Sequence, residues 1–349
     1  MKIFLTFFLI IFSRTVMSAC TVTTPYSVDV PLTIGRLSVG DAMPNGTVVM
    51  NQRIIGVRNV NVSCQKATTL AKFELSGGEL YPNRIGIVAY KTGIEGLGVR
   101  FKQAYTNEYF PTAQSEGSGL NYITDKYLSV YVEFIKLGKI TPGVIDTSRL
   151  PKINISHTES NNPNMYNVAT YNLTGTATTI EVPTCTTPDL RWNLGSVDAS
   201  KMKTKGDASE WVDTPITLTN CSVFYGNNAN GSYTRYETSS NTGNLQGSLN
   251  NNVLSVKITP TTAIIDSNNG ILGLDKNSTT SDIGIQLGSK QTGNHQPLNL
   301  LSDMQIIPDI GYSGGTITFP LSARMIKTSD NVTSPGKAST SVIYTINYK

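Results

Sequence analysis

Charged residues, histidines and long apolar runs are scarce in this chain of 349 residues. Asp, Glu, Lys and Arg together make up 15% of it, and it contains two histidines and four cysteines. An ordinary soluble domain carries about 25% charged residues. After the N-terminus, no segment reaches the roughly 20 consecutive apolar residues of a transmembrane helix. The sequence therefore offers few groups for acid–base or metal chemistry and no membrane-spanning helix.

Helical periodicity is also missing. No window of helical length places apolar residues at positions i, i+3, i+4 and i+7. The chain has 30 glycines and 16 prolines, and Asn, Ser and Thr recur throughout. These polar residues compete with the hydrogen bonds of a helical backbone. Apolar and aromatic residues nevertheless return at short intervals, which excludes a disordered chain. We expect an all-β protein.

Short alternating runs separated by turns fill both halves of the chain. The longest run of the first half covers residues 127–135 and is rich in β-branched and aromatic side chains. Strands spaced by roughly 8–12 residues in two blocks predict two β-sandwiches in tandem. A Thr/Gly-rich stretch separates the blocks. We expect a first domain over residues 20–175, a linker over 176–183 and a second domain over 184–349.

The N-terminus has the pattern of a secretory signal peptide, which we assign to residues 1–19. Lys2 precedes an apolar run over residues 3–12, and small residues close the segment. The alternative is a lipoprotein signal with Cys20 as the modified residue, but Met17 fits poorly three positions before it. Cleavage lowers the net charge from +4 to +2. A charge that small argues against nucleic acid as a partner.

An exported chain with four cysteines is expected to form two disulfides. Of the three connectivities we favour the local one, which puts one bridge in each half. The pairs are then Cys20–Cys64 and Cys185–Cys221. Each bridge would close a loop of about 40 residues and stabilise the fold by roughly 4 kcal/mol. Zinc binding is the alternative, but there is no Cys-x-x-Cys pair, and His157 and His295 lie far from any cysteine. We expect no metal and no cofactor.

The second half carries a series of segments in a fixed order. They are Pro183-Thr-Cys185, residues 189–195, 216–221, 284–287, 318–324 and 334–338. This series resembles the pilin domain of bacterial chaperone–usher fimbriae. In that family a glycine stands fourteenth from the C-terminus and a tyrosine is penultimate, and Gly336 and Tyr348 occupy these places. Met325 departs from the pattern, because many relatives carry an aromatic residue there. The resemblance implies an immunoglobulin-like fold that lacks its last strand.

The same resemblance implies how the second half is completed. A groove would run beside the terminal strand and would be lined by Val342, Tyr344, Ile346 and Tyr348. A periplasmic chaperone would supply the missing strand first, and the N-terminal extension of the next fimbrial subunit would then replace it at the outer-membrane usher. Basic residues of the chaperone would hold the carboxylate of Lys349. The alternative is that residues 338–349 form an ordinary closing strand of a complete sandwich.

Three segments of the first half point to the same system. Residues 37–46, 90–100 and 133–140 resemble the receptor-binding domain of two-domain fimbrial tip adhesins, most of all the type 3 fimbrial adhesin group. The mature chain would open at Cys20 without a donor extension, as expected for the distal end of a fibre. The resemblance implies an adhesin exported through the periplasm to the fimbrium tip on the cell surface. Its receptor would be a host glycan, which we favour, or an extracellular-matrix protein.

One loop of the first half holds the best candidates for receptor contact. Residues 103–125 combine aromatic rings with amide and carboxylate groups, a mixture that suits a sugar. The candidates are Arg100, Tyr105, Asn107, Tyr109, Tyr122 and Asp125. Arg100 ends the preceding strand and would pair with an acidic sugar or a protein carboxylate. The alternative is that these tyrosines pack over the edge of the sandwich and that Arg100 is structural.

Other functions fit the sequence less well. Nucleophilic catalysis needs a base within reach, and the two histidines and four paired cysteines leave few candidates. Residues 117–119 do not form a Gly-x-Ser-x-Gly elbow. A glycosidase with two carboxylates stays open, as does a secreted eukaryotic glycoprotein. We expect no enzyme, and the main alternative to an adhesin is a minor tip or adapter pilin without its own receptor.

Overall fold

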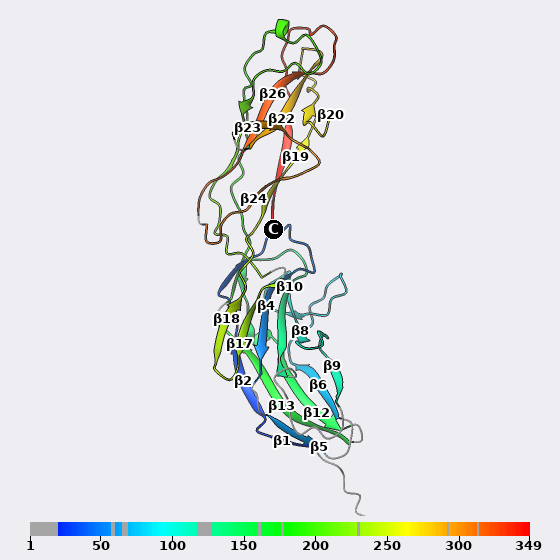
Figure 1. The fold of residues 1–349 in the computed structure, drawn as a ribbon, viewed down its shortest axis with the longest axis vertical. Helices are drawn as coiled ribbons and strands as arrows, with labels where there is room; N and C mark the ends of the chain where they lie inside the picture. The colour runs from blue at the N-terminus through cyan, green and yellow to red at the C-terminus, as the bar shows by residue number, and fades with distance from the viewer. Residues whose placement is uncertain are drawn as a thin grey trace, which may run out of the picture.

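The chain folds into β-strands stacked in two units along one long axis, with the C-terminus at the junction of the two units (Figure 1). The computed structural model describes residues 20–56, 60–64, 69–116, 128–159, 162–175, 178–228, 231–291, 293–312 and 314–349. The predicted signal peptide over residues 1–19 lies outside them. Within the described residues, no helix has the length and apolar character needed to span a membrane. The predicted all-β class is confirmed.

The first unit is a sandwich of two main sheets. The six-stranded sheet has the order β18 (Thr242–Gln246), β17 (Tyr233–Glu237), β4 (Val48–Ile55), β10 (Val130–Lys136), β8 (Leu97–Gln103) and β7 (Tyr90–Lys91). The five-stranded sheet has the order β2 (Tyr26–Pro31), β13 (Asn162–Thr174), β12 (Lys152–Glu159), β6 (Thr69–Ser76) and β9 (Thr112–Glu116). Two small sheets pair β1 (Cys20–Thr23) with β5 (Asn61–Cys64), and β14 (Thr179–Glu181) with β11 (Gly143–Val144) and β3 (Arg36–Ser38).

Alternation along β10 shows how the first core forms. Val130, Val132 and Phe134 are fully buried between the two sheets, while Tyr131 lies on the opposite face and is half-buried. Burying each of these apolar side chains contributes roughly 1.5–3 kcal/mol. The outward face of the six-stranded sheet is thereby left for polar and aromatic residues.

The second unit has smaller sheets and its own core. One sheet has the order β15 (Val212–Asp213), β26 (Leu321–Lys327), β22 (Ile283–Gln291), β21 (Ile271–Leu272) and β20 (Ile264–Asp266), with β23 (Asn294–Pro297) also on β22. The others pair β16 (Ile216–Leu218) with β25 (Ile317–Phe319), and β19 (Leu254–Pro260) with both β24 (Met304–Ile306) and β27 (Val342–Tyr348). The short 3-10 helix η2 (Ala199–Lys201) lies in this unit. Phe224, Leu254 and Phe319 are fully buried at the centre of the core.

A hairpin from the second half of the chain belongs to the first unit. β17 pairs in parallel with β4, from Thr234 opposite Gln52 to Glu237 opposite Ile55. The side chain of Tyr236 is buried in the core of the first unit. In Figure 1 the yellow-green β17 and β18 lie directly beside the blue β4. The predicted linker over residues 176–183 did not anticipate that strands of the second half join the first unit. The predicted linker itself contains β14.

The end of the chain packs against the first unit. The backbone N–H of Ala42 donates to the carbonyl of Tyr348 at 3.0 Å. The Asn252 side-chain amide donates to the carbonyls of Ser38 at 3.1 Å and Lys349 at 3.2 Å. A Cβ atom on Gly40 would lie 2.0 Å from the Tyr348 carbonyl oxygen, so only glycine permits this approach. These contacts tie β27 to the first unit.

The cysteines follow the predicted division between the halves. A disulfide joins Cys185 to Cys221, as expected. Cys20 is also disulfide-bonded, and the backbone register of β1 and β5 places it opposite Cys64. The side chain of Cys64 is outside the described part of the structure, so its pairing with Cys20 stays a prediction.

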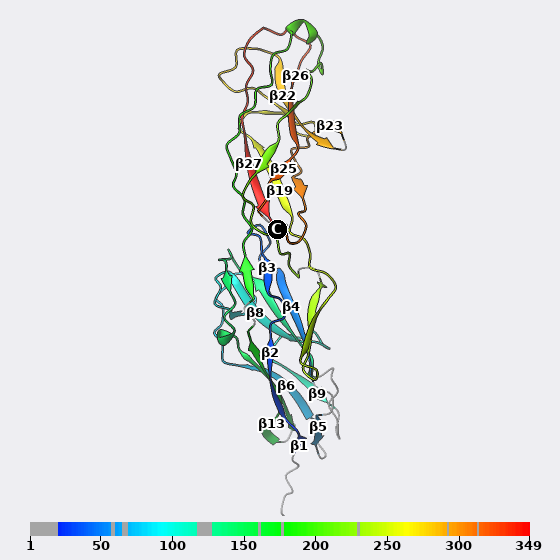
Figure 2. The same ribbon diagram turned by 90° about the vertical axis from the view of Figure 1, so that its left-hand side faces the viewer.

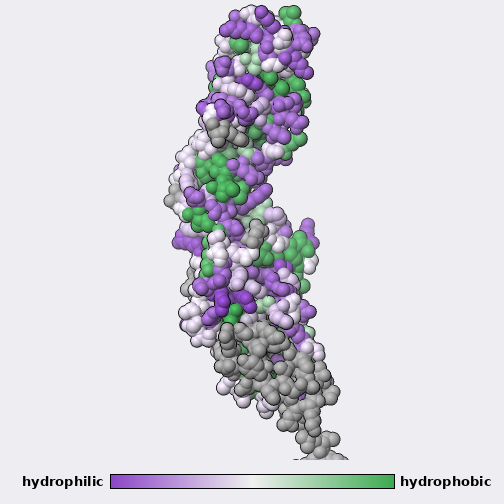
Figure 3. Space-filling model, viewed as in Figure 1, coloured by the Kyte–Doolittle hydropathy of each residue, from purple (hydrophilic) through white to green (hydrophobic). Residues whose placement is uncertain are grey.

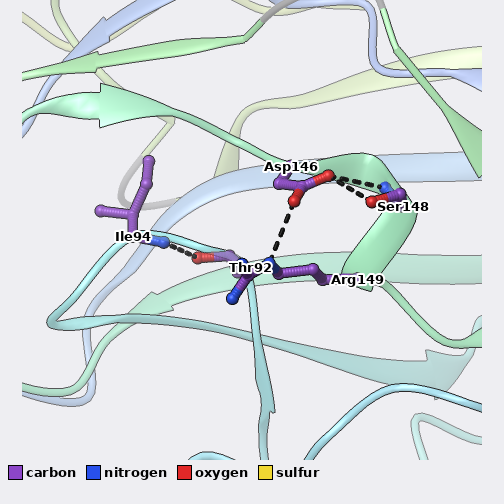
Figure 4. Close-up of polar contacts among 5 residues, drawn as sticks. All are labelled: Thr92, Ile94, Asp146, Ser148 and Arg149. Carbon is purple, nitrogen blue, oxygen red and sulfur yellow. Dashed lines mark hydrogen bonds and ion pairs between the residues drawn. The ribbon is translucent and has the colours of Figure 1, made fainter.

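A capped turn supports the end of the first unit near β7 (Figure 4). Asp146 caps the 3-10 helix η1 (Thr147–Arg149), accepting hydrogen bonds from the Ser148 backbone N–H at 3.1 Å and hydroxyl at 2.6 Å. Arg149 Nε donates to the second oxygen at 3.0 Å. These hydrogen bonds, first of all that from the Ser148 hydroxyl, lower the pKa of the exposed Asp146 carboxyl. Nearby, Thr92 Oγ1 accepts from the Ile94 N–H at 3.3 Å.

His157 on β12 makes the stability of the first unit depend on pH. It is buried, its Nδ1 has no hydrogen-bond partner, and burial lowers its pKa from 6.5 to about 4. Between these values the unfolded chain binds a proton that the folded chain does not. Stability therefore falls as the pH decreases from 6.5 to 4, by about 3 kcal/mol.

We expect His157→Phe to reduce this acid-dependent loss, because the variant has no imidazole to protonate on unfolding. Urea unfolding of the full chain at several pH values between 4 and 7 measures the effect. His295→Gln is the control and should keep the pH dependence, since His295 is a half-exposed residue of the second unit. Equal losses in the wild type and His157→Phe would show that protonation at His157 is not the cause.

Candidate functional sites

The outer edge of β27 is the first candidate. On one side β27 pairs with β19 over its whole length, and among the described residues no other strand pairs with it. Lys349 and Val253 exchange backbone hydrogen bonds, so the backbone groups of residues 347, 345 and 343 also face β19. Those of Val342, Tyr344 and Ile346 face away from it. Within the described part of the chain, no backbone partner is recorded for them.

An extended segment runs near this edge without pairing to it. Leu190, Trp192 and Leu194 alternate with exposed residues and pack on the core of the second unit, as a strand would. No backbone–backbone hydrogen bond is recorded for residues 187–197 among the described residues. Two tyrosines of β27 reach the start of the segment instead. Tyr348 accepts from the Cys185 N–H at 2.9 Å, and the Tyr344 hydroxyl donates to the Pro188 carbonyl.

The side chains of β27 divide between two faces. Val342, Tyr344, Ile346 and Tyr348 pack partly buried against the core, whereas Ile343 is 59% exposed. Figure 2 shows the red β27 beside β19, ending at the junction. Further hydrophobic side chains are exposed on the second unit, seen as green patches in the upper part of Figure 3. β27 thus has apolar side chains directed inward and an unpaired backbone edge, the two features that an added strand uses.

The second candidate is a polar face on the six-stranded sheet of the first unit. The structure brings together two of the residues predicted from the sequence. The guanidinium carbon of Arg100 lies 4.3 Å from the ring centroid of Tyr109. Both side chains bind Glu133, Arg100 through Nε at 2.8 Å and Tyr109 through its hydroxyl at 3.2 Å. Burial, and then the charge of Glu133, raise the pKa of the Tyr109 hydroxyl.

The structure describes two of the remaining four predicted residues, and both precede Tyr109 in the same loop. Tyr105 is 61% exposed, and Asn107 lies in the turn before Tyr109 with a positive φ of 62°. Tyr122 and Asp125 fall in residues 117–127, outside the described residues. The receptor-contact role of all six residues stays a prediction.

Glu133 is the central residue that sequence reasoning missed. Its side chain is 4% exposed, and it binds Lys102 Nζ at 2.8 Å as well as Arg100. The one sequence feature that could have identified Glu133 is its position as an acidic residue inside the predicted strand 127–135. Such a residue usually faces solvent, so it was not singled out. Only the register of β10 with β8, which sets Glu133 opposite Arg100, shows that it lies between two cations.

The polar face continues across the sheet and includes the hairpin from the second half. Arg53 lies 5.7 Å and Lys102 5.1 Å from the ring centroid of Tyr131. The rings of Tyr131 and Tyr233 meet edge to face at 5.9 Å. We call this surface the cation–tyrosine face. It comprises Arg53, Arg100, Lys102, Tyr109, Tyr131, Glu133, Tyr233 and Arg235.

No protein-family model and no curated protein matches the sequence. Solved structures with a similar fold include the receptor-binding domain of the plasmid-born adhesin MrkD1P of Klebsiella pneumoniae. It is 19% identical at a TM-score of 0.36, over 48% of this chain and 98% of that one. The CupB6 tip adhesin from Pseudomonas aeruginosa is 13% identical at 0.36, over 94% of each chain. The P pilus rod subunit PapA is 17% identical at 0.29, over 47% of this chain and 99% of that one.

The identities and TM-scores of these similar structures are low, so a function can be assigned only from the residues of this chain. The outer edge of β27 and the cation–tyrosine face are the two sites from which a function can be inferred.

Glu133→Gln should destabilise the first unit by about 3 kcal/mol, because it leaves Arg100 and Lys102 together without the buried carboxylate between them. Urea denaturation of the full chain measures this change. Glu237→Gln is the matched control. Glu237 pairs with Arg235 where both side chains are more than a third exposed, so its loss should cost less than about 1 kcal/mol. Equal effects of the two substitutions would contradict the central role of Glu133.

Proposed function

We propose that the chain is a two-domain tip adhesin of a chaperone–usher fimbria. Its first unit binds a receptor on the host surface, and its second unit is anchored to the fimbria by a strand from another chain. The observation that carries the proposal is the outer edge of β27, where backbone groups of Val342, Tyr344 and Ile346 have no backbone partner in the described chain.

An added strand would satisfy this edge and cover apolar surface at once. Each backbone hydrogen bond contributes about 0.5–1.5 kcal/mol net. Side chains of the incoming strand would also pack beside Val342, Tyr344 and Ile346, which are only partly buried. An open edge of this kind is an aggregation hazard if it stays exposed. A partner strand would therefore stabilise both the unpaired backbone groups and the partly buried apolar side chains of β27.

This requirement fits a succession of partners. A periplasmic chaperone would cover the edge during export, and the N-terminal extension of the next subunit would replace it at the outer-membrane usher. The chain would then stand at the fimbrium tip on the cell surface, with no catalytic role. The alternative, a minor tip or adapter pilin without a receptor, does not account for the cation–tyrosine face, where Tyr109 is 44% exposed and the Arg235 side chain 38% exposed.

The full mature chain should bind a peptide that adds a strand to β27. A peptide with alternating apolar residues should raise the melting temperature by several degrees at saturating concentration. A peptide of the same composition with its apolar residues clustered should not. Thermal unfolding with each peptide measures the difference.

Two variants of β27 test the location of the bound peptide. Ile346→Lys places a charge on the face that packs toward the core and should abolish the stabilisation, whereas Thr345→Lys changes an exposed side chain and should preserve it. The full chain is used because β17 and β18 of the second half are part of the first unit. No stabilisation by either peptide, or equal effects of the two variants, would contradict strand addition at β27.

A further inference from the structure

Two arginines lie side by side on the cation–tyrosine face. Arg53 on β4 is directly opposite Arg235 on β17 in the parallel register. Like charges directly opposite each other on neighbouring strands destabilise a sheet. The Nε atom of each arginine is buried without a hydrogen-bond partner. Arg235 is paired with Glu237 at 2.5 Å, whereas no ion pair is recorded for Arg53 within the described residues.

The cations at the two ends of the face are paired differently. Arg100 and Lys102 both bind the buried Glu133. At the other end Glu237 pairs with Arg235 alone, so Arg53 is the cation of the face for which no ion pair is recorded within the described residues. An arginine without a recorded ion pair, placed beside a second arginine, can bind an external anion, because arginine presents a planar fork of donors to carboxylate and sulfate groups.

Aromatic and amide groups frame this pair. Tyr131 of β10 is directly opposite Arg53 of β4, and Tyr233 is on the same face of β17 as Arg235. Asn244 of β18 is directly opposite Arg235. Half-buried tyrosine rings present flat apolar surface, and amides hydrogen-bond hydroxyl groups, which together match a sugar ring better than a peptide carboxylate.

We propose that the Arg53–Arg235 pair binds the carboxylate or sulfate group of an acidic sugar, with Tyr131 and Tyr233 against the sugar ring. This inference rests on the proposed adhesin function and names its ligand class. The site is composite. Arg53 and Tyr131 come from the first half of the chain, and Tyr233 and Arg235 come from the hairpin of the second half. The predicted first domain over residues 20–175 would carry only half of it.

Binding of the full mature chain to immobilised probes tests the proposal. The acidic probes are 3′-sulfolactose, which carries a sulfate, and sialyllactose, which carries a carboxylate. Lactose, polyglutamate and collagen complete the set. Arg53→Gln and Arg235→Gln should each weaken binding to an acidic sugar at least tenfold, and binding should weaken with added salt. Arg84→Gln removes the same charge from an exposed position elsewhere on the first unit and should change binding less than twofold.

The outcomes separate this inference from the proposed function. Preference between the two acidic sugars identifies the sulfate or the carboxylate. Equal losses in all three variants, or stronger binding to polyglutamate, would overturn the acidic-sugar site. Binding to lactose or collagen alone would overturn it as well and leave the adhesin function standing. Binding to no probe would count against both the site and a receptor role, while strand addition at β27 is measured separately. Unchanged melting temperatures show that the variants fold.

Discussion

The unpaired outer edge of β27 is the constraint on which the account of this protein depends. Buried backbone groups are normally hydrogen-bonded, and a long apolar strand with an open edge is an aggregation hazard. β27 is paired with β19 alone, while Val342, Tyr344 and Ile346 direct their side chains to the core and their backbone groups away from β19. The nearby segment around Trp192 has the burial pattern of a strand without pairing to it. A strand from another chain would satisfy both.

The two units are connected through more than the linker. The carbonyl of Tyr348 accepts from Ala42 of the first unit, and the hairpin that contains Arg235 extends the six-stranded sheet. Backbone hydrogen bonds therefore join both the end of β27 and the hairpin to the first unit. Because of the hairpin, the first unit contains strands from both halves of the chain.

Local patterns predicted the local features. The all-β class, the apolar face of the terminal strand and the Cys185–Cys221 disulfide followed from alternation and from cysteine spacing. Arg100 and Tyr109 were named because basic and aromatic residues lay close together in sequence. The pairing of β17 with β4 could not be predicted, since paired residues such as Gln52 and Thr234 are 182 positions apart and no local pattern encodes their register. Glu133 was missed for the same reason, because its neighbours lie across β8 and not along β10.

Amide hydrogen exchange along β27 in the full mature chain shows whether the outer edge of this strand is unpaired. We expect an alternating profile in the absence of a partner. The amides of Ile343 and Thr345, which face β19, should exchange slowly, and those of Tyr344 and Ile346 should exchange fast. Addition of a strand-forming peptide should then slow the exchange at Tyr344 and Ile346. Slow exchange at all four amides in the chain alone would show that the edge is already paired and would contradict the account.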